Sequence, residues 1–343
     1  MMKLLVLLIA LIFTFPLRAF DSSHRMAIYS DLCTDIQALG ALWELDLSAQ
    51  KDLPCLSLQG EYSLFGSYQS TWEGSHSAKM DMAAYRAWIS LSRPQTQLRI
   101  GLQRLNFGSA KTLRPLQWFD SLDPLDPHQY TGGVEAILLR HHWLNNANLW
   151  LWGVLGDSKL RGNEFLPGEK DRPEFGGRMQ YPLPIGDMAL SYHQRDLQGG
   201  NERRLGLDLR MDYCIGIWAE SSLSQYEDVF LAPGFTINST LGMDYTFSLG
   251  NGLALVFEQG YLRSWDDENA AIKLDKAVSA MMLSYPLNIL DNVAAVFAVD
   301  WEEEDAGVSA VWQRVYDYFS VELSGKASSK EHTSLHAMIN LHF

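Results

Sequence analysis

The ten residues Arg204 to Tyr213, RLGLDLRMDY, decide the fold because their side chains alternate strictly between apolar and polar. The apolar positions share one face of an extended strand: Leu205, Leu207, Leu209, Met211 and Tyr213. In a soluble sheet that face packs on a second layer of protein. Here similar segments follow one another, and the sequence offers no helix or second sheet to cover them. We therefore expect lipid to cover the apolar faces, as in a closed membrane barrel.

Sixteen segments repeat this pattern from Leu56 to the last residue. We expect strands to begin near Leu56, Ala83, Thr96, Val134, Ala147, Glu174, Gly186, Asn201, Ile215, Phe235, Gly252, Ala277, Asn292, Gly307, Tyr318 and Thr333. Fourteen strands remain an alternative, because the first segment and the region 308–325 admit other divisions. The predicted fold is all-β: a transmembrane, antiparallel, up-and-down β-barrel of about sixteen strands spanning residues 56–343.

The connections between these segments alternate in length. Every second one is tight, as at 93–95 and 250–252, whereas the others are mostly longer, as at 70–82, 109–133 and 157–173. Short turns at one end and long loops at the other are typical of bacterial outer-membrane barrels. An even strand count then places both termini in the periplasm.

Two segments precede the predicted barrel. Residues 1–19 carry Lys3, an apolar run of about a dozen residues and a small residue at Ala19, which is the pattern of a secretory signal peptide. Residues 20–55 form a predicted periplasmic segment or small plug. Leu39, Leu42 and Trp43 stand at helical spacing there and predict a short capped helix.

Three cysteines fit an exported protein that relies little on disulfides. Cys33 and Cys55 both precede the strand pattern and are candidates for a bridge, which would leave Cys214 unpaired. The spacing alone does not establish the close Cα approach that a disulfide requires.

Charged side chains recur on the polar, inward face of the predicted strands. The expected basic wall of the pore consists of Arg86, Arg99, Arg178, Arg195, Arg204 and Arg210, with Arg140 as a further inward position. The expected acidic wall consists of Glu61, Glu220, Asp244, Glu258, Asp300 and Glu322. Two interpretations stay open: a transverse field across a water-filled passage, or pairing of these groups with one another.

The longest predicted loop, 109–133, is too apolar to lie loose in water, so we expect it to pack against the inner wall or fold over the mouth. It is the predicted constriction of the pore. Its candidate residues are Arg114, Trp118, Phe119, Asp120, Asp123 and Asp126.

Other function classes receive little support. The formal charge of -14 argues against nucleic-acid binding. We find no nucleophile, metal or phosphate-loop motif, so we expect no enzyme activity, no cofactor and no metal. The final strand alternates up to Phe343. A terminal phenylalanine on such a strand resembles the signal that the barrel assembly machinery of Gram-negative bacteria reads.

The stretch Leu98 to Leu138 resembles a recurrent feature of Gram-negative porin-like outer-membrane barrels. There, a Gly-x-Gln-Arg strand end leads into a loop with Asp-Pro repeats and a Gly-Val that opens the next strand. The resemblance is carried by Gly101, Gln103, Arg104, Gly108, Phe119, Asp123, Pro124, Asp126, Pro127, Gly133 and Val134. It implies location and fold rather than a solute, and the charged inner face suggests the arrangement of general diffusion porins.

Two functions follow from this pattern. The first is an outer-membrane channel for passive diffusion of small hydrophilic solutes, surrounded by outer-membrane lipid and lipopolysaccharide. The alternative is a closed structural or interaction barrel that serves as subunit or anchor of an envelope assembly or export machine. The inward positions are charged and small rather than apolar, which favours the channel. The sequence allows a homo-oligomer without requiring one.

Overall fold

The computed structural model describes residues 19–33, 37–53, 55–73, 75–120, 131–229, 232–265, 274–330 and 333–342. The strands formed by these residues are β1 (Ala19–Cys33), β2 (Gln37–Leu53), β3 (Leu56–Glu73), β4 (Ser75–Arg93), β5 (Thr96–Gln103), β6 (Val134–His142), β7 (Asn148–Leu155), β8 (Pro173–Leu183), β9 (Gly186–Leu197), β10 (Gly200–Asp212), β11 (Gly216–Glu227), β12 (Phe235–Phe247), β13 (Leu253–Trp265), β14 (Asp275–Pro286), β15 (Asp291–Asp300), β16 (Asp305–Val315), β17 (Phe319–Ser328) and β18 (Ser334–His342). Within these ranges, no helix is long and apolar enough to cross a membrane.

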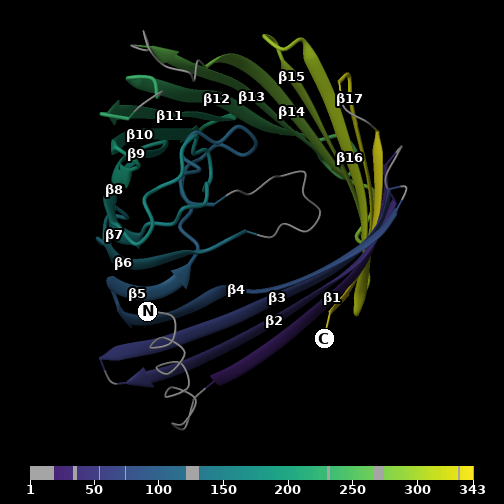
Figure 1. Cartoon of the computed structure of the whole chain (residues 1–343), viewed down its shortest axis with the longest axis horizontal. Coiled ribbons are helices and arrows are strands. Elements are labelled where there is room, and N and C mark those ends of the chain that lie inside the picture. The colour runs from purple at the N-terminus through teal and green to yellow at the C-terminus, as the bar shows by residue number, and fades with distance from the viewer. Residues whose placement is uncertain are drawn as a thin grey trace.

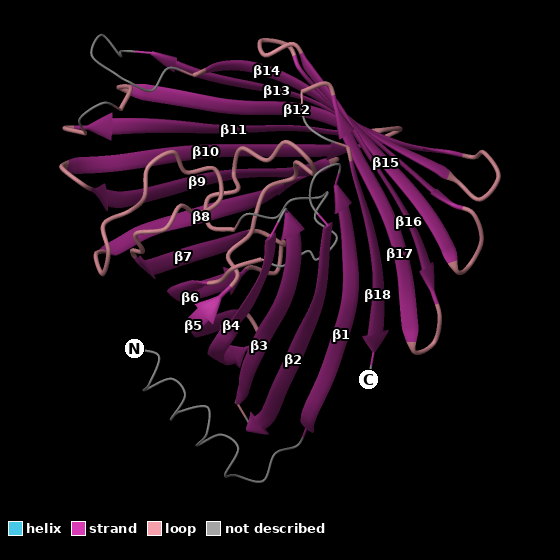
Figure 2. Ribbon diagram, turned by 45° about the vertical axis from the view of Figure 1, so that its right-hand side comes forward, coloured by secondary structure: helices cyan, strands magenta, loops and turns pink. Residues whose placement is uncertain are grey.

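Each strand pairs antiparallel with the next along the chain, and β1 pairs with β18, so the sheet closes into a barrel without an open edge (Figures 1 and 2). The predicted all-β, up-and-down barrel is confirmed. The strand count is eighteen within the described residues rather than the sixteen expected.

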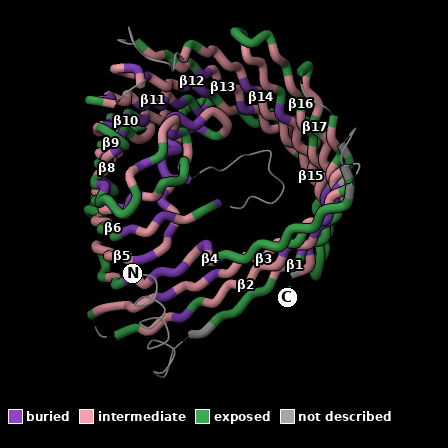
Figure 3. The backbone as a smooth tube through the Cα atoms, viewed as in Figure 1, coloured by how far each residue is buried: buried purple, intermediate pink, exposed green. Residues whose placement is uncertain are grey.

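The alternation that predicts the strands also orients them. On β10, Leu205 and Leu207 are 57% and 43% exposed, whereas Arg204 and Asp208, which flank them in the sequence, are buried. Along several walls of the barrel, exposed and buried residues alternate in this way (Figure 3). The apolar side chains therefore point out of the barrel, and the charged ones point into it.

The expected strand starts agree with the observed ones to within two residues except at β4, which begins at Ser75 rather than near Ala83. The long loop expected at 70–82 is therefore wrong. The register keeps β3 and β4 paired up to Glu73 and Ser75, so the connection is a tight hairpin.

The region 20–55 is not a periplasmic segment, plug or helix; that prediction is wrong. It forms β1 and β2, the two strands that close the barrel between β18 and β3. The helical spacing misled because Leu39, Leu42 and Trp43 lie in a longer run of period two. In that run Ala38 and Leu42 are buried, whereas Leu39 is 50% exposed.

The expected disulfide between Cys33 and Cys55 is also wrong. Cys33 ends β1 and Cys55 follows β2, so the 17 residues of β2 separate them, roughly 55 Å of extended chain. Cys55 and Cys214 are free thiols. The predicted signal peptide, apart from Ala19 at the start of β1, lies outside the described residues, as does Phe343.

The two ends of the barrel differ as the break lengths predict. Tight turns such as 94–95 and 184–185 lie at the end where β1 starts and β18 finishes. The long connections 104–133 and 156–172 lie at the opposite end. Both ends of the described chain therefore sit at the rim that carries the tight turns.

Candidate functional site

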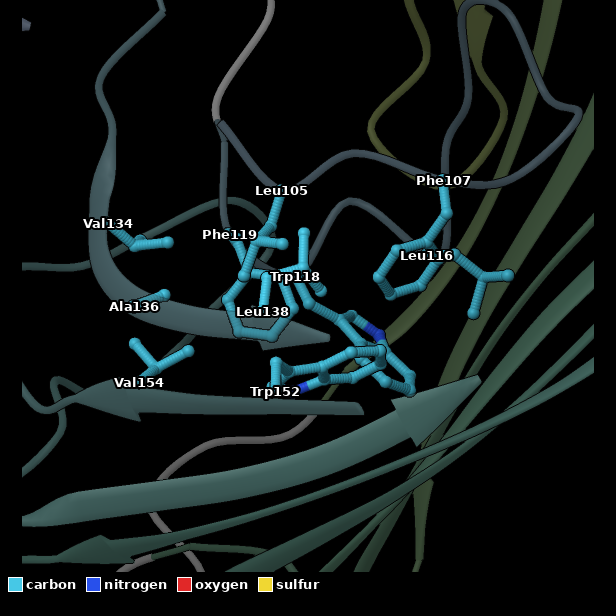
Figure 4. Close-up of a cluster of buried hydrophobic side chains, with 10 residues drawn as sticks. All are labelled: Leu105, Phe107, Leu116, Trp118, Phe119, Val134, Ala136, Leu138, Trp152 and Val154. Atoms are coloured by element: carbon cyan, nitrogen blue, oxygen red, sulfur yellow. The ribbon is translucent and has the colours of Figure 1, made fainter. Parts of the chain in front are cut away.

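The connection between β5 and β6 spans residues 104–133, and its described part, 104–120, folds into the barrel instead of extending from its rim (Figure 1). Its apolar side chains pack on the inner faces of β6 and β7 (Figure 4). The buried cluster consists of Leu105, Phe107, Leu116, Trp118, Phe119, Val134, Ala136, Leu138, Trp152 and Val154. The loop thus packs against the inner wall, as its apolar composition predicts.

Aromatic rings fix the position of this loop. Phe107 stacks on Trp152 with ring centroids 5.5 Å apart and meets the edge of Trp118 at 5.4 Å. Phe119 contacts Trp152 edge to face at 5.7 Å. Such pairs stabilise by about 0.5–1.5 kcal/mol each beyond the area they bury. The loop is therefore part of a packed core inside the barrel.

The wall opposite this cluster is shaped to receive the loop. At Gly206 on β10, an added Cβ would lie 2.5 Å from Leu116 Cδ2 and 3.1 Å from Trp118 Cζ2. Only glycine leaves that space free. Trp118 also donates a hydrogen bond from Nε1 to Ser222 Oγ on β11 at 3.0 Å.

Glu258 on β13 binds the backbone of the loop. Its Oε2 accepts hydrogen bonds from the amides of Thr112 and Leu113 at 2.8 and 2.6 Å, and its Oε1 accepts from the amide of Lys111 at 2.7 Å. The indole of Trp218 donates to Oε1 at 3.0 Å. Glu258 is fully buried, and four donors satisfy its carboxylate.

Glu220 on β11 binds the same loop at two further points. It accepts hydrogen bonds from the amides of Ala110 at 2.9 Å and Leu116 at 2.7 Å. The carboxylate lies so close to Gly108, whose φ is 105°, that a Cβ there would approach it to 2.5 Å. Glycine is required at that position both for its backbone conformation and for its lack of a side chain.

Asp208 on β10 links the loop to the basic side of the barrel. It accepts a hydrogen bond from Ser109 Oγ at 2.6 Å and pairs with Arg178 Nη2 at 2.5 Å. Arg178 also lies over the ring of Phe107. Its charge is therefore neutralised beneath the loop.

The second long connection, 156–172, is held by a buried ion network. Arg195 binds Glu202 at 2.5 Å and Glu164 of the loop at 3.1 Å. Arg204 donates to both oxygens of Glu202, at 2.7 and 2.8 Å. None of these side chains is more than 5% exposed. Removing one member of such a network leaves a buried charge unpaired.

The two inward loops also contact each other. The amide of Asn163 donates to the carbonyl of Gln117 at 2.9 Å, and the Asn163 side chain donates to the carbonyl of Arg114 at 2.5 Å. The loops therefore form one internal layer against the wall.

The expected basic wall needs correction in its central part. Arg178, Arg195 and Arg204 do point inward, but they are buried and paired. Their partners are Asp208 and Glu202 on β10 and Glu164 of the second loop, so the three arginines do not line free pore space. Arg210 is partly exposed and pairs with Asp212 at 2.9 Å. The pairing interpretation is the better description of this region.

Most residues of the expected acidic wall also have partners in the structure. Glu220 and Glu258 face inward but bind the loop backbone, so treating them as free pore-lining charges is wrong. Asp244 pairs with Lys111 at 2.7 Å. Asp300 pairs with Lys276 at 3.2 Å. Glu322 on β17 is 8% exposed.

Unpaired basic charge remains on β5 and β6. Arg99 lies over Trp88, and Arg140 lies over Trp150, each with its guanidinium carbon 3.9 Å from the ring centroid. Within the described chain, neither guanidinium forms an ion pair, and the Nε of each is buried without a hydrogen-bond partner.

Acidic groups face the lumen on the neighbouring strands. Glu44 and Asp46 on β2 both lie within hydrogen-bond distance of Tyr85 Oη, whose single proton they share. Glu44 also pairs with Arg25 at 2.7 Å, and Glu61 on β3 is partly exposed. The sequence interpretation missed Glu44 and Asp46, because it assigned β2 to a helix. The period-two pattern of β2 was the signal that would have placed them inward.

A β-bulge positions Arg86. The register of β3 and β4 shifts between Ser63 and Leu64, next to Tyr85 and Arg86. Bulges re-aim side chains in this way. Arg86 donates to the carbonyl of Thr131 at 3.0 Å and to its hydroxyl at 2.9 Å, and so holds the returning end of the long loop.

The predicted constriction residues have mostly structural contacts. Trp118 and Phe119 lie in the buried cluster, Arg114 donates to the Asn106 side chain, and Asp120 pairs with Arg104 at 2.8 Å. Asp123 and Asp126 lie outside the described residues. In the described part of the chain, no three potential metal-ligating side chains converge.

No protein-family model and no curated protein matches the chain. Solved structures match its fold over nearly the whole length. OccAB4 from Acinetobacter baumannii superposes with a TM-score of 0.61 at 10% identity, covering 94% of this chain and 97% of that one. The outer membrane protein OpdK from Pseudomonas aeruginosa gives 0.60 at 10% identity, with 96% and 100% covered.

OmpF from Salmonella typhi, solved in complex with daunomycin, gives a TM-score of 0.55 at 10% identity, with 94% and 97% covered. The chain thus has the porin-like barrel fold that the stretch 98–138 suggested. At these identities the likeness establishes the fold alone.

Proposed function

We propose that the protein is a channel of the bacterial outer membrane through which small hydrophilic solutes diffuse passively. The described part of the first loop, residues 104–120, narrows the passage. The observation that carries this proposal is a closed barrel with apolar side chains outside and charged ones inside. Lipid favours the first surface, and water favours the second.

Solvent exposure inside the barrel supports a passage beside the loops. The inward side chains of Arg25 and Asp31 on β1 keep 43% and 38% of their exposure. Inward side chains behind the loops, such as Arg178 and Arg195, keep 5% and 0%. The loops thus fill one side of the lumen, and β1 faces water on the other.

In this proposal the field does not cross the lumen but lies between two arcs of the same wall that are separated by β4. Its basic side is Arg99 and Arg140 on β5 and β6, and its acidic side is Glu44, Asp46 and Glu61 on β2 and β3. A dipolar solute would orient between these two arcs. The surrounding partners are outer-membrane lipid and lipopolysaccharide, with both termini in the periplasm.

The structural alternative is a barrel whose lumen is blocked. One observation favours it: two inward loops pack on the wall and on each other. Conductance of the purified protein in a planar bilayer separates the two functions. The channel gives steady ohmic steps. A barrel with a blocked lumen gives no current, and it conducts only after the loops are removed.

A further inference from the structure

We propose that Glu258, assisted by Glu220, sets the width of the passage by holding residues 110–116 of the loop against the wall formed by β11 and β13. These two positioning residues act through the loop backbone and not through contact with the solute. This inference rests on the proposed channel function and names the groups that fix its cross-section.

The loop presents three successive amides, those of Lys111, Thr112 and Leu113, to one carboxylate. Successive N–H groups that converge in this way form an anion-binding concavity. The barrel wall supplies the anion itself. Within the described residues, no lysine or arginine pairs with Glu258, so these amides and the Trp218 indole stabilise the buried charge.

The hydrogen-bond pattern requires a carboxylate. Each oxygen of Glu258 accepts two hydrogen bonds, and every partner is a donor. Glutamine would place an NH₂ group, itself a donor, against two of these donors. At least two of the four hydrogen bonds would be lost, although the side chain keeps its size.

The contact of Glu258 and Glu220 with the loop lies far from the loop's other anchor, so it determines where the segment between the two anchors sits in the lumen. The apolar cluster anchors the loop on β6 and β7, whereas Glu220 and Glu258 extend from β11 and β13. From Ser109 to Leu113 the loop contacts four successive strands, at Asp208 on β10, Glu220 on β11, Asp244 on β12 and Glu258 on β13. Release at this end would free the segment between the two anchors to move across the lumen.

The test compares Glu258→Gln and Glu258→Ala with the wild type in single-channel recordings. We expect conductance to fall about twofold and its noise to rise, because the freed segment moves across the part of the lumen that the wild-type contact keeps open. Formate should return the Glu258→Ala conductance toward the wild-type value, because it supplies two carboxylate oxygens to the vacant amides. Unchanged conductance in both variants would overturn the proposal.

Glu227→Gln is the matched control. It makes the same chemical change on β11, at a side chain that pairs with Arg203 at 2.8 Å and lies outside the loop contacts. It should conduct like the wild type. Heat-modifiable electrophoretic mobility confirms that each barrel has folded before it is recorded.

A second readout does not depend on conduction. Nitroxides at Thr112→Cys and Ser309→Cys, in a chain with Cys33, Cys55 and Cys214 replaced by serine, report the distance from the loop to β16. The distribution should be narrow in the wild type, broad in Glu258→Ala and narrow again with formate. If the distance distribution is equally narrow in all three, Glu258 does not hold the loop in place. If every protein is electrically silent but the distance distributions change as expected, Glu258 does hold the loop and the proposed channel function is wrong.

Discussion

Single residues decide which inward charges reach the solute. Arg204 and Glu202 share the polar face of β10 and pair there, but the sequence analysis did not identify Glu202 as the partner or the loops that bury the pair. Arg99 and Arg140 look equivalent to Arg178 by alternation alone. They differ because Trp88 and Trp150 lie beneath them and no carboxylate of the described residues pairs with them. Such differences depend on neighbours from other strands.

Replacing Arg99 and Arg140 together by glutamine should shift ion selectivity toward cations, because it removes two positive charges that form no ion pair within the described residues. Reversal potentials in a salt gradient measure this shift. Arg203→Gln removes a charge from the outer face and should leave the reversal potential unchanged. An identical reversal potential in the double variant would show that these guanidinium groups do not face the conducting path.

Trp118→Ala should lower the free energy of unfolding by about 3–5 kcal/mol, since it removes a large buried ring from the cluster inside the barrel. Urea unfolding in detergent micelles measures the change. Trp143→Ala, at a turn where the side chain is 40% exposed, serves as the control. Equal stability of the two variants would mean that the loop does not pack as a core.

At the scale of elements, strand periodicity predicted β5 to β18 closely, since each keeps a period of two between clear breaks. It failed at β1 and β2, where apolar residues at helical spacing hid the alternation. It also failed at the β3–β4 connection, where the strands continue to Glu73 and Ser75. The fold of the inward loops depends on contacts distant in sequence, such as Glu258 with Thr112, and no local pattern encodes them.

Deleting residues 20–53 should prevent formation of the closed barrel. β1 pairs with β18 and β2 pairs with β3, so the deletion leaves two unpaired edges in lipid. Loss of the heat-modifiable folded band on electrophoresis measures this outcome. A stable barrel after the deletion would support a periplasmic extension and contradict the closure seen here.

At the scale of the whole molecule, the barrel separates two environments. Its outer surface carries the apolar half of each alternating strand, and its interior holds charged side chains with two loops packed among them. The sequence predicted this division and the class of fold. It did not predict how much of the charge serves to hold the loops, because that depends on how the loops fold.

Single-channel conductance of the purified protein in a planar bilayer tests the central claim most directly. We expect steady, ohmic steps from the wild type and larger steps after deletion of residues 109–131. Silence from both proteins, with folding confirmed by electrophoretic mobility, would contradict a diffusion channel.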